Sequence, residues 1–155
     1  METTITIRRS VAGDRIQVAE MRTALWPDGP FDEHLADFDQ LLATGMCGTL
    51  PAATFVAEDA TGALVGFLDA GLRSHADSCD VRQPVGYIEG WWVREDSRNR
   101  GIGRGLVQAA EDWARAQGCK EMASDALIDN HVSLVAHEAL GFEVVERAYL
   151  FRKAL

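Results

Sequence analysis

The sequence has few cysteines and no long apolar run, and each shortage excludes a class of protein. Its three cysteines, Cys47, Cys79 and Cys119, are odd in number and lack CxxC spacing, so they indicate neither a disulfide framework nor a structural zinc site. No apolar run approaches the roughly 20 residues of a membrane span. The start, Met1 to Arg9, has no basic segment followed by an apolar one, as a secretory signal would. We therefore expect a cytoplasmic protein that neither binds a membrane nor holds a metal ion.

Positive charge is also scarce, and the charges are unevenly distributed. The net charge of −9 argues against binding to nucleic acid and favours the attraction of cations. Five acids and no lysine or arginine lie between Asp28 and Asp39, whereas Arg94 to Arg104 holds four arginines. The first region suits a cation and the second an anion, although ordinary solvated surfaces can show the same pattern.

The length of 155 residues, with 47% hydrophobic residues and only 4 prolines, predicts one compact domain over residues 1–155. Periodicity and turn residues predict strands over residues 4–8, 54–58, 63–72, 87–93 and 120–124, and a last strand or hairpin over 142–153. They predict helices over 18–25, 32–45, 101–117 and 130–140. This order indicates an α/β layer structure.

Two of these helices carry more detailed expectations. Asp32 is expected to cap the second helix, which would turn Leu35, Phe38 and Leu42 inward and end near Gly45. In the last helix the residues expected to face inward are Val132, Val135, Ala136 and Ala139.

A glycine-rich turn leads from the strand at 87–93 into the long helix. Free N–H groups at a helix N-terminus attract anions, and glycines leave room for a ligand to approach. Arg98, Arg100 and Arg104 can add charge-assisted hydrogen bonds to a pyrophosphate. The spacing matches neither a Walker loop nor a Rossmann fingerprint. On glycine spacing alone, a flexible helix start explains the turn equally well.

At this turn the sequence resembles a known family. Arg98-x-x-Gly101-x-Gly103 after a strand resembles the acyl-CoA signature Q/R-x-x-G-x-G/A of the GNAT superfamily, and Asn130-x-x-Ser133 with Gly141-Phe142 resembles its second half. Further segments resemble, in the same order, the aminoglycoside 6′-N-acetyltransferases of one bacterial subgroup: Leu25-Trp26-Pro27, Asp32 to Leu35, Glu89-Gly90, Ala123 to Asp125, His137 to Phe142 and Glu146-Arg147. The similarity spans nearly the whole chain. It implies an α/β (α+β) fold with a central mixed sheet flanked by helices on both faces.

The resemblance also implies acetyl-CoA as the cofactor, with coenzyme A as product. In such proteins the central strand holds the pantetheine arm through its backbone, the glycine turn holds the pyrophosphate, and an asparagine at the last helix contacts the cofactor. Carried onto this sequence, these positions are Trp91, Trp92 and Val93, then Arg98, Asn99, Arg100, Gly101, Ile102, Gly103 and Arg104, and finally Asn130. A backbone N–H near Val93 can then stabilise charge on the thioester carbonyl.

Two acids are the candidate catalytic residues. Glu89 precedes Gly90 on the strand at 87–93, and Asp125 ends the neighbouring strand, so both can face the crevice at the strands' carboxyl ends. Gly90 itself indicates a bulge or the close approach of a ligand. An acceptor amine arrives protonated, and nearby carboxylates bind it and accept its proton. The alternative is that each acid is an exposed strand-end charge.

Three further residues match substrate contacts of the family. Trp26 precedes a helix-stopping proline and the acidic run, although a tryptophan there can equally pack in the core. Glu146 lies near the last strands, where a pair with Arg147 would look the same. His75 lies in the polar loop after residue 72, where the alignment is loose.

The general acid is left unassigned. Many GNAT enzymes have a tyrosine seven residues after the helix asparagine, where this chain has His137, as the aminoglycoside subgroup does. Tyr149 is the nearest alternative but is expected to pack as a strand aromatic. A thiolate leaving group with a pKa near 8.5 needs little help from an acid. Cys119 has no evident histidine partner, so we expect direct transfer without an acyl-enzyme.

The function expected from the resemblance is acetylation of an aminoglycoside 6′-amine, giving antibiotic resistance, by a homodimer. Two alternatives stay open at this point. One is a GNAT enzyme acting on a polyamine, a small metabolite or a protein N-terminus, and the other is a non-catalytic acyl-CoA-binding module. The first alternative shares the cofactor site, so only the acidic residues expected to bind the acceptor discriminate between it and an aminoglycoside acetyltransferase. The second alternative would leave Glu89 and Asp125 without a catalytic role.

Overall fold

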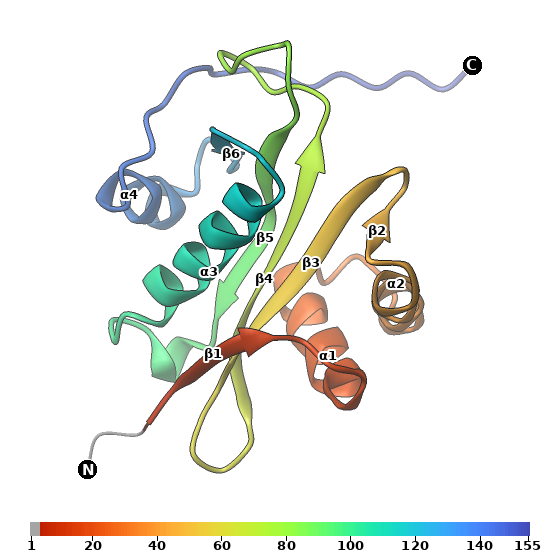
Figure 1. Cartoon of the computed structure of the whole chain (residues 1–155), viewed down its shortest axis with the longest axis vertical. Helices are drawn as coiled ribbons and strands as arrows, with labels where there is room; N and C mark the ends of the chain where they lie inside the picture. Colours follow the sequence, from red (N-terminus) through yellow and green to blue (C-terminus); the bar gives the residue numbers. More distant parts are fainter. Residues whose placement is uncertain (1–3) are drawn as a thin grey trace.

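A mixed β-sheet runs through the middle of the protein in a computed structural model that describes residues 4–155 (Figure 1). Residues 1–3, which begin the segment judged to lack a secretory signal, lie outside the described residues. The strands lie in the order β1-β3-β4-β5-β6, with β2 beside β3; all neighbours are antiparallel except β5 and β6. Their bounds are β1 Thr6–Arg9, β2 Met46–Cys47, β3 Leu50–Glu58, β4 Leu64–Arg73, β5 Val85–Val93 and β6 Met122–Ser124.

Helices cover both faces of this sheet, as Figure 1 shows. They are α1 Arg15–Leu25, α2 Phe31–Thr44, α3 Ile102–Ala116 and α4 His131–Ala139, with short 3₁₀ turns η1 Ala12–Asp14 and η2 Glu95–Ser97. Alternation along the strands divides the core: Phe55 and Ala57 pack in the cluster under α3, whereas Val56 packs with Val18 of α1 and Phe38 of α2. The expected α/β fold, a mixed sheet with helices on both faces, is confirmed. Within residues 4–155, no helix has the length and apolar character needed to cross a membrane.

The second helix differs in detail from the sequence prediction. Pro30 is extended and α2 begins directly after it, so the expected N-cap, Asp32, lies inside the first turn, where the helix dipole favours a carboxylate. Gly45 adopts the left-handed conformation, with a φ of 66°, and ends the helix as predicted. His34 and Phe38 are buried, but Leu42 is exposed. The face through His34 and Phe38 continues toward Leu41, which is half-buried, and leaves Leu42 outside.

The face predicted to be inward on the last helix is wrong. Val132 and Val135 are 77% and 65% exposed, Ala139 is exposed, Ala136 is half-buried, and α4 has no buried residue. The helix instead turns His137 toward the body, where its ring meets Trp91 edge-on. The valine stripe is therefore an apolar surface that this chain does not cover.

The predicted strand or hairpin over residues 142–153 is absent. Residues 143–155 have no regular secondary structure and are all exposed, and in Figure 1 they leave α4, pass the end of the sheet and run away from it. This segment, the C-terminal tail, carries the exposed apolar residues Val144, Val145, Tyr149, Leu150, Phe151 and Leu155. Tyr149 is 89% exposed, so its expected packing is also wrong for a single chain. The residues have strand propensity, but a strand forms only where another strand pairs with it.

Candidate active site

The two predicted acids lie side by side where two parallel strands separate. β5 pairs with β6 only through Gly86, Tyr87 and Ile88, and the last pair joins Ile88 to Ser124. The next residues along the two strands are Glu89 and Asp125. The structure therefore brings both acids to the end of this ladder, and both are exposed to solvent.

A bulge in β5 explains why Glu89 is presented there. Asp69 of β4 pairs with Gly90, and the next residue, Ala70, pairs with Ile88, so Glu89 is the extra residue. The bulge agrees with the prediction made from Gly90. The close approach at Gly90 comes from the protein itself, because a Cβ there would overlap the ring of Trp26. The Trp26 ring therefore lies against Gly90, which directly follows Glu89 in the sequence.

A buried polar network, which sequence reasoning missed, fixes the end of α1 that carries Trp26. Arg22 is 6% exposed and donates from Nε and Nη2 to the two carboxylate oxygens of Asp69, at 3.0 and 2.9 Å. It also donates to the carbonyl oxygen of His34 and the hydroxyl of Thr54. The backbone N–H of Trp26 donates to the Arg22 carbonyl at 2.7 Å. Loss of one partner would leave a buried charge uncompensated.

Trp26 itself is partly in the core and partly in solvent. Its ring packs edge-on against Phe67 and is stacked with His34, at centroid distances of 6.1 and 6.2 Å. The residue is nevertheless 37% exposed. The structure thus accommodates both interpretations of Trp26, a ring that packs on the sheet and a surface that a ligand can reach.

Arg73 and Tyr87, which sequence reasoning also missed, connect the two acids. Arg73 ends β4 and donates from Nε and Nη2 to the two oxygens of Glu89, at 2.9 and 2.8 Å. Its guanidinium carbon lies 3.5 Å from the centroid of the Tyr87 ring. The Tyr87 hydroxyl donates to Oδ2 of Asp125 at 2.6 Å. We call Arg73, Tyr87, Glu89 and Asp125 the acid cluster.

The electrostatics of the acid cluster keep its hydrogen-bond roles fixed. Burial and the hydrogen bond to Asp125 raise the pKa of the Tyr87 phenol well above its usual value, so Tyr87 stays a neutral donor near pH 7. The hydrogen bonds to Glu89 raise the pKa of the Arg73 guanidinium further. The spacing of two residues between Tyr87 and Glu89 on one strand is a sequence signal that the two share a face, but it does not indicate the contact of Tyr87 with Asp125.

The glycine-rich turn is ordered by its own backbone contacts. Gly101 adopts a φ of 78° and precedes the first residue of α3, and Asn99 also has a positive φ. Arg98 donates from Nε to the carbonyl oxygen of Val93 at 2.8 Å, which connects the turn to the end of β5. Ile102 is buried in the core, so only its backbone can meet a ligand. The first N–H groups of α3 have no partner within the helix and are available to an anion.

Packing gives a second reason for a glycine at position 103. A Cβ on Gly103 would lie 3.0 Å from the Trp91 ring, so a larger residue there would crowd that ring, and the ring or the start of α3 would have to shift. Trp91 belongs to the hydrophobic cluster under α3 and Trp92 to the one under α1. These two side chains therefore point to opposite faces of the sheet.

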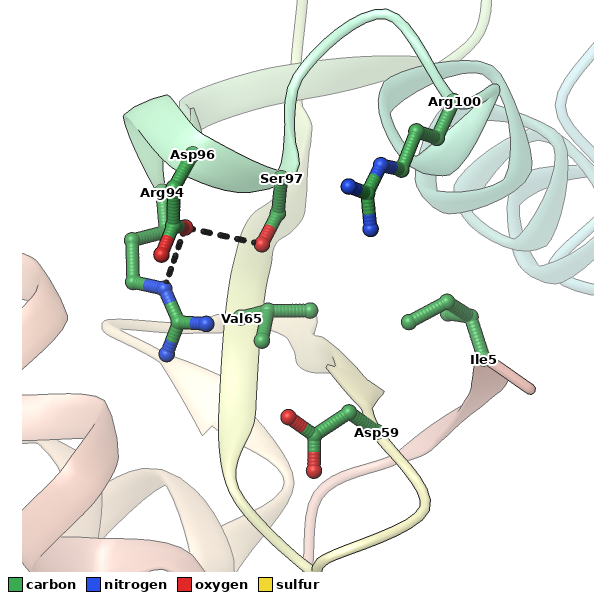
Figure 2. Close-up of a pocket in the computed structure, with 7 residues that line it drawn as sticks. All are labelled: Ile5, Asp59, Val65, Arg94, Asp96, Ser97 and Arg100. Atoms are coloured by element: carbon green, nitrogen blue, oxygen red, sulfur yellow. Dashed lines mark hydrogen bonds and ion pairs between the residues drawn. The ribbon is translucent and has the colours of Figure 1, made fainter. Parts of the chain in front are cut away.

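A cavity of about 310 Å³ lies beside the turn and is lined by residues of opposite charge (Figure 2). Arg94 pairs with Asp96 at 2.6 Å and holds the pKa of that carboxyl below its usual range. Figure 2 shows the Arg100 side chain extending toward this cavity, which Asp59 also lines. The lining holds two acids and two arginines, so the cavity is close to neutral.

The last helix carries the predicted cofactor residue Asn130 and also His137, which stands where many GNAT enzymes have a tyrosine. The Asn130 side-chain oxygen accepts a hydrogen bond from the Ser133 N–H at 3.0 Å, so it caps α4. His137 Nδ1 lies 2.7 Å from the Ser133 carbonyl oxygen and must carry a proton to bond it. In the neutral ring Nε2 then accepts from the Ser124 hydroxyl at 2.8 Å. Neutral His137 therefore has no spare donor for a leaving group.

Three residues lie apart from the acid cluster. His75 sits in the exposed loop after β4 with its Nδ1 3.0 Å from the Ser74 hydroxyl, and Glu146 lies on the exposed tail. Cys119 is buried, and burial raises the pKa of its thiol, which disfavours the nucleophilic thiolate. The structure thus joins Trp26, Glu89 and Asp125, and it does not bring His75 or Glu146 to them within one chain.

Comparison with known proteins places these features in a family. A sequence model of the Acetyltransferase (GNAT) family matches residues 17–142. A protein of Klebsiella aerogenes named aminoglycoside N(6′)-acetyltransferase type 1 is 37% identical over 155 residues, which cover 100% of both chains. A protein of the same name from Salmonella typhimurium is 40% identical over 134 residues, which are 86% of this chain and 88% of that protein.

Solved structures show the same relationship. AAC(6′)-Iy in complex with the bisubstrate analogue CoA-S-monomethyl-acetylneamine has a TM-score of 0.88 and 36% identity, and the match covers 98% of this chain and 99% of that one. AAC(6′)-Ih from Acinetobacter baumannii, an aminoglycoside 6′-N-acetyltransferase, has a TM-score of 0.86 and 32% identity over 98% and 99% of the two chains. The chain therefore belongs to the GNAT family of acetyltransferases, on the branch of the aminoglycoside N(6′)-acetyltransferases.

Proposed function

We propose that the protein transfers the acetyl group of acetyl-CoA to the 6′-amine of an aminoglycoside and thereby confers resistance to it. The observation that carries this proposal is the arrangement along β5: Glu89, beside Asp125, lies four residues before Val93 at the end of the strand, and the glycine-rich turn follows that strand and leads into α3. An acceptor held at the acids is thus next to a cofactor held at the turn. Relatives of closely similar length bear the corresponding name.

The residues present suit coenzyme A. The unpaired first N–H groups of α3 can hold the pyrophosphate, with Arg98 and Arg104 nearby, and the backbone of Trp91 to Val93 can hold the pantetheine arm. When bound, acetyl-CoA supplies an acetyl thioester that is open to attack by an amine. Glu89 and Asp125 bind the acceptor as an ammonium ion and provide a path for the proton that it loses. We assign Asn130, the cap of α4, a contact with the cofactor, as the resemblance implies.

We propose direct transfer within a ternary complex. The buried Cys119 thiol, with its raised pKa, is unsuited to form an acyl-enzyme. Neither neutral His137 nor the exposed Tyr149 supplies an obvious acid, and a thiolate of pKa near 8.5 leaves readily without one.

The test is a thiol-release assay with acetyl-CoA over a panel of amines. We expect turnover of aminoglycosides that carry a free 6′-amine, and little N-acetylation of analogues with a 6′-hydroxyl. Turnover of spermidine or peptides together with no turnover of any aminoglycoside would favour a metabolite or protein acceptor. Binding of acetyl-CoA without turnover of any amine would favour the non-catalytic module.

We further propose that the protein is a homodimer in which the C-terminal tail is covered by the second copy. The tail exposes six large apolar side chains, and the valine stripe of α4 is exposed as well. Such surface is costly in water and marks an interface. Glu146 lies on this tail. It can reach an acceptor only if the dimer brings the tail to a site, and His75 likewise requires movement of its loop.

Removal of residues 143–155 is expected to convert the dimer into a monomer, because the tail supplies apolar surface to the interface. The measurement is molar mass by light scattering after size exclusion. The double variant Leu150→Ser/Phe151→Ser should weaken the dimer in the same direction. The matched control, Arg152→Gln/Lys153→Gln, changes only polar side chains and should leave the mass unchanged. A full-length monomer, or a dimer that survives the truncation, would contradict the proposal.

We place the enzyme in the cytoplasm, with neither nucleic acid nor membrane as a partner. Cys47, Cys79 and Cys119 are free thiols, as is usual in a reducing compartment. The net charge of −9 disfavours the phosphate backbone of nucleic acids.

A further inference from the structure

Arg73 is the residue of the acid cluster that the proposed chemistry does not use. It is a cation placed beside carboxylates that are proposed to receive a cationic acceptor. Its two hydrogen bonds to Glu89 are bidentate, and its guanidinium also lies on the Tyr87 ring. An arginine held from two sides has little freedom to leave when a ligand arrives.

The geometry leaves room at Glu89 for both Arg73 and an ammonium group. An ionised carboxylate has about four acceptor positions, and Arg73 uses two of them, one on each oxygen. The remaining positions can bind an ammonium group of the acceptor. Arg73 therefore does not need to be displaced, and its contacts restrict the directions that the Glu89 side chain can take.

The same arginine acts on Asp125 through Tyr87. The ring on which Arg73 rests belongs to the tyrosine whose hydroxyl donates to Asp125 at 2.6 Å. The Tyr87 side chain is buried, so its position is set by the sheet. The two acids come from strands that separate just after them, and this chain of contacts connects their side chains across that point.

We propose that Arg73 is a positioning residue that holds Glu89, and through Tyr87 also Asp125, in the arrangement that receives the acceptor's ammonium groups. This inference rests on the proposed function, because it assumes that the two acids bind the acceptor. It assigns Arg73 no contact with the reacting atoms. The proposal also predicts how replacement of Arg73 changes the affinity for the acceptor. If Arg73 competed with the acceptor's ammonium groups, its loss would raise that affinity, whereas loss of a positioning residue lowers it.

The decisive variant is Arg73→Met, which keeps a long side chain and removes the charge and both hydrogen bonds. We expect the acceptor KM to rise by up to about fivefold, as loss of a well-formed exposed pair would produce, and the dissociation constant for acetyl-CoA, measured by calorimetry, to stay the same. Arg73→Lys should recover only part of the loss, because a lysine cannot bond both oxygens in a fixed plane. The melting temperature should change little, since Arg73 and Glu89 are both substantially exposed.

A double-mutant cycle separates positioning from a general structural role. Because Arg73 acts through Glu89 and, by way of Tyr87, on Asp125, the Arg73→Met/Glu89→Gln double variant should lose clearly less than the two single losses combined. Additive losses in the double variant would overturn the proposal. So would an acceptor KM that is unchanged or lowered in Arg73→Met, and a lowered KM would show that Arg73 competes with the acceptor. If wild-type protein acetylated no aminoglycoside, the proposed function would fail first, and calorimetry of aminoglycoside binding to wild type and Arg73→Met would still decide the role of Arg73.

Discussion

Gly103→Asp is expected to abolish the rise in melting temperature that acetyl-CoA produces in the wild-type protein. A ligand that binds only the folded state stabilises it by mass action, so the size of the rise reports cofactor binding. Gly103 lies in the first turn of α3, where the proposed pyrophosphate site is, and a carboxylate there would repel the phosphates. The new Cβ would also lie 3.0 Å from the Trp91 ring and crowd the contact between α3 and β5. Both effects act against the cofactor.

Two control variants separate charge from packing. Gly103→Ala adds the same Cβ without the charge, and we expect it to weaken the cofactor response without removing it. Gln108→Glu adds the same charge on the exposed side of α3, beyond its first turn, and should leave the response intact. A wild-type response in Gly103→Asp would exclude the glycine-rich turn as the cofactor site.

The sequence predicted well those elements whose two sides differ in polarity. The helix predicted over residues 101–117 forms, and its apolar stripe of Ile102, Leu106, Ala110 and Trp113 is buried. The β3–β4 hairpin and the left-handed end of α2 at Gly45 were also predictable, because each depends on a local pattern of a few residues. Periodicity indicates which face of an element is apolar. In these elements that face packs against other parts of the same chain, so the predicted burial is observed.

The same reasoning failed where nothing in the chain covers an apolar surface. Val132 and Val135 have the spacing of an inward face, and Tyr149 to Phe151 read as a strand, yet all are exposed in the single chain. A pattern shows that a face is apolar without showing what packs on it. The tail and the valine stripe were therefore misassigned for one reason, and the proposed dimer would account for both.

The candidate site was only partly predictable for a different reason. Glu89 and Asp125 each end a local motif, so the sequence indicated them. The partners Arg73 and Tyr87 depend on the strand register and on the bulge at Glu89, which sequence spacing does not specify. The network of Arg22 with Asp69 joins α1 to β4 across the core, and its partners are likewise set only by the tertiary fold.

Glu89→Gln and Asp125→Asn are expected to lower kcat/KM for aminoglycosides at least roughly tenfold each, while acetyl-CoA affinity stays close to wild type. Both changes keep size and hydrogen-bonding capacity and remove one charge. A hydrogen bond to a charged group is worth about 1.5–3 kcal/mol, and 1.4 kcal/mol corresponds to a factor of ten. The matched control is Glu138→Gln, which removes the same charge from an exposed position on α4 and should leave kcat/KM unchanged.

The two variants should differ in which kinetic constant they change. We assign the proton path to Glu89, because it adjoins the part of β5 proposed to hold the thioester, and acceptor positioning to Asp125, whose carboxylate is already held by Tyr87. Glu89→Gln should therefore lower kcat as well as raise the acceptor KM, and the basic limb of its pH profile should change. Asp125→Asn should mainly raise KM, since the amide oxygen can still accept from Tyr87. Steady-state kinetics across pH, with cofactor affinity measured separately, distinguish these outcomes.

Wild-type kcat/KM in both variants would refute the site, and a kcat loss confined to Asp125→Asn would reverse the two roles.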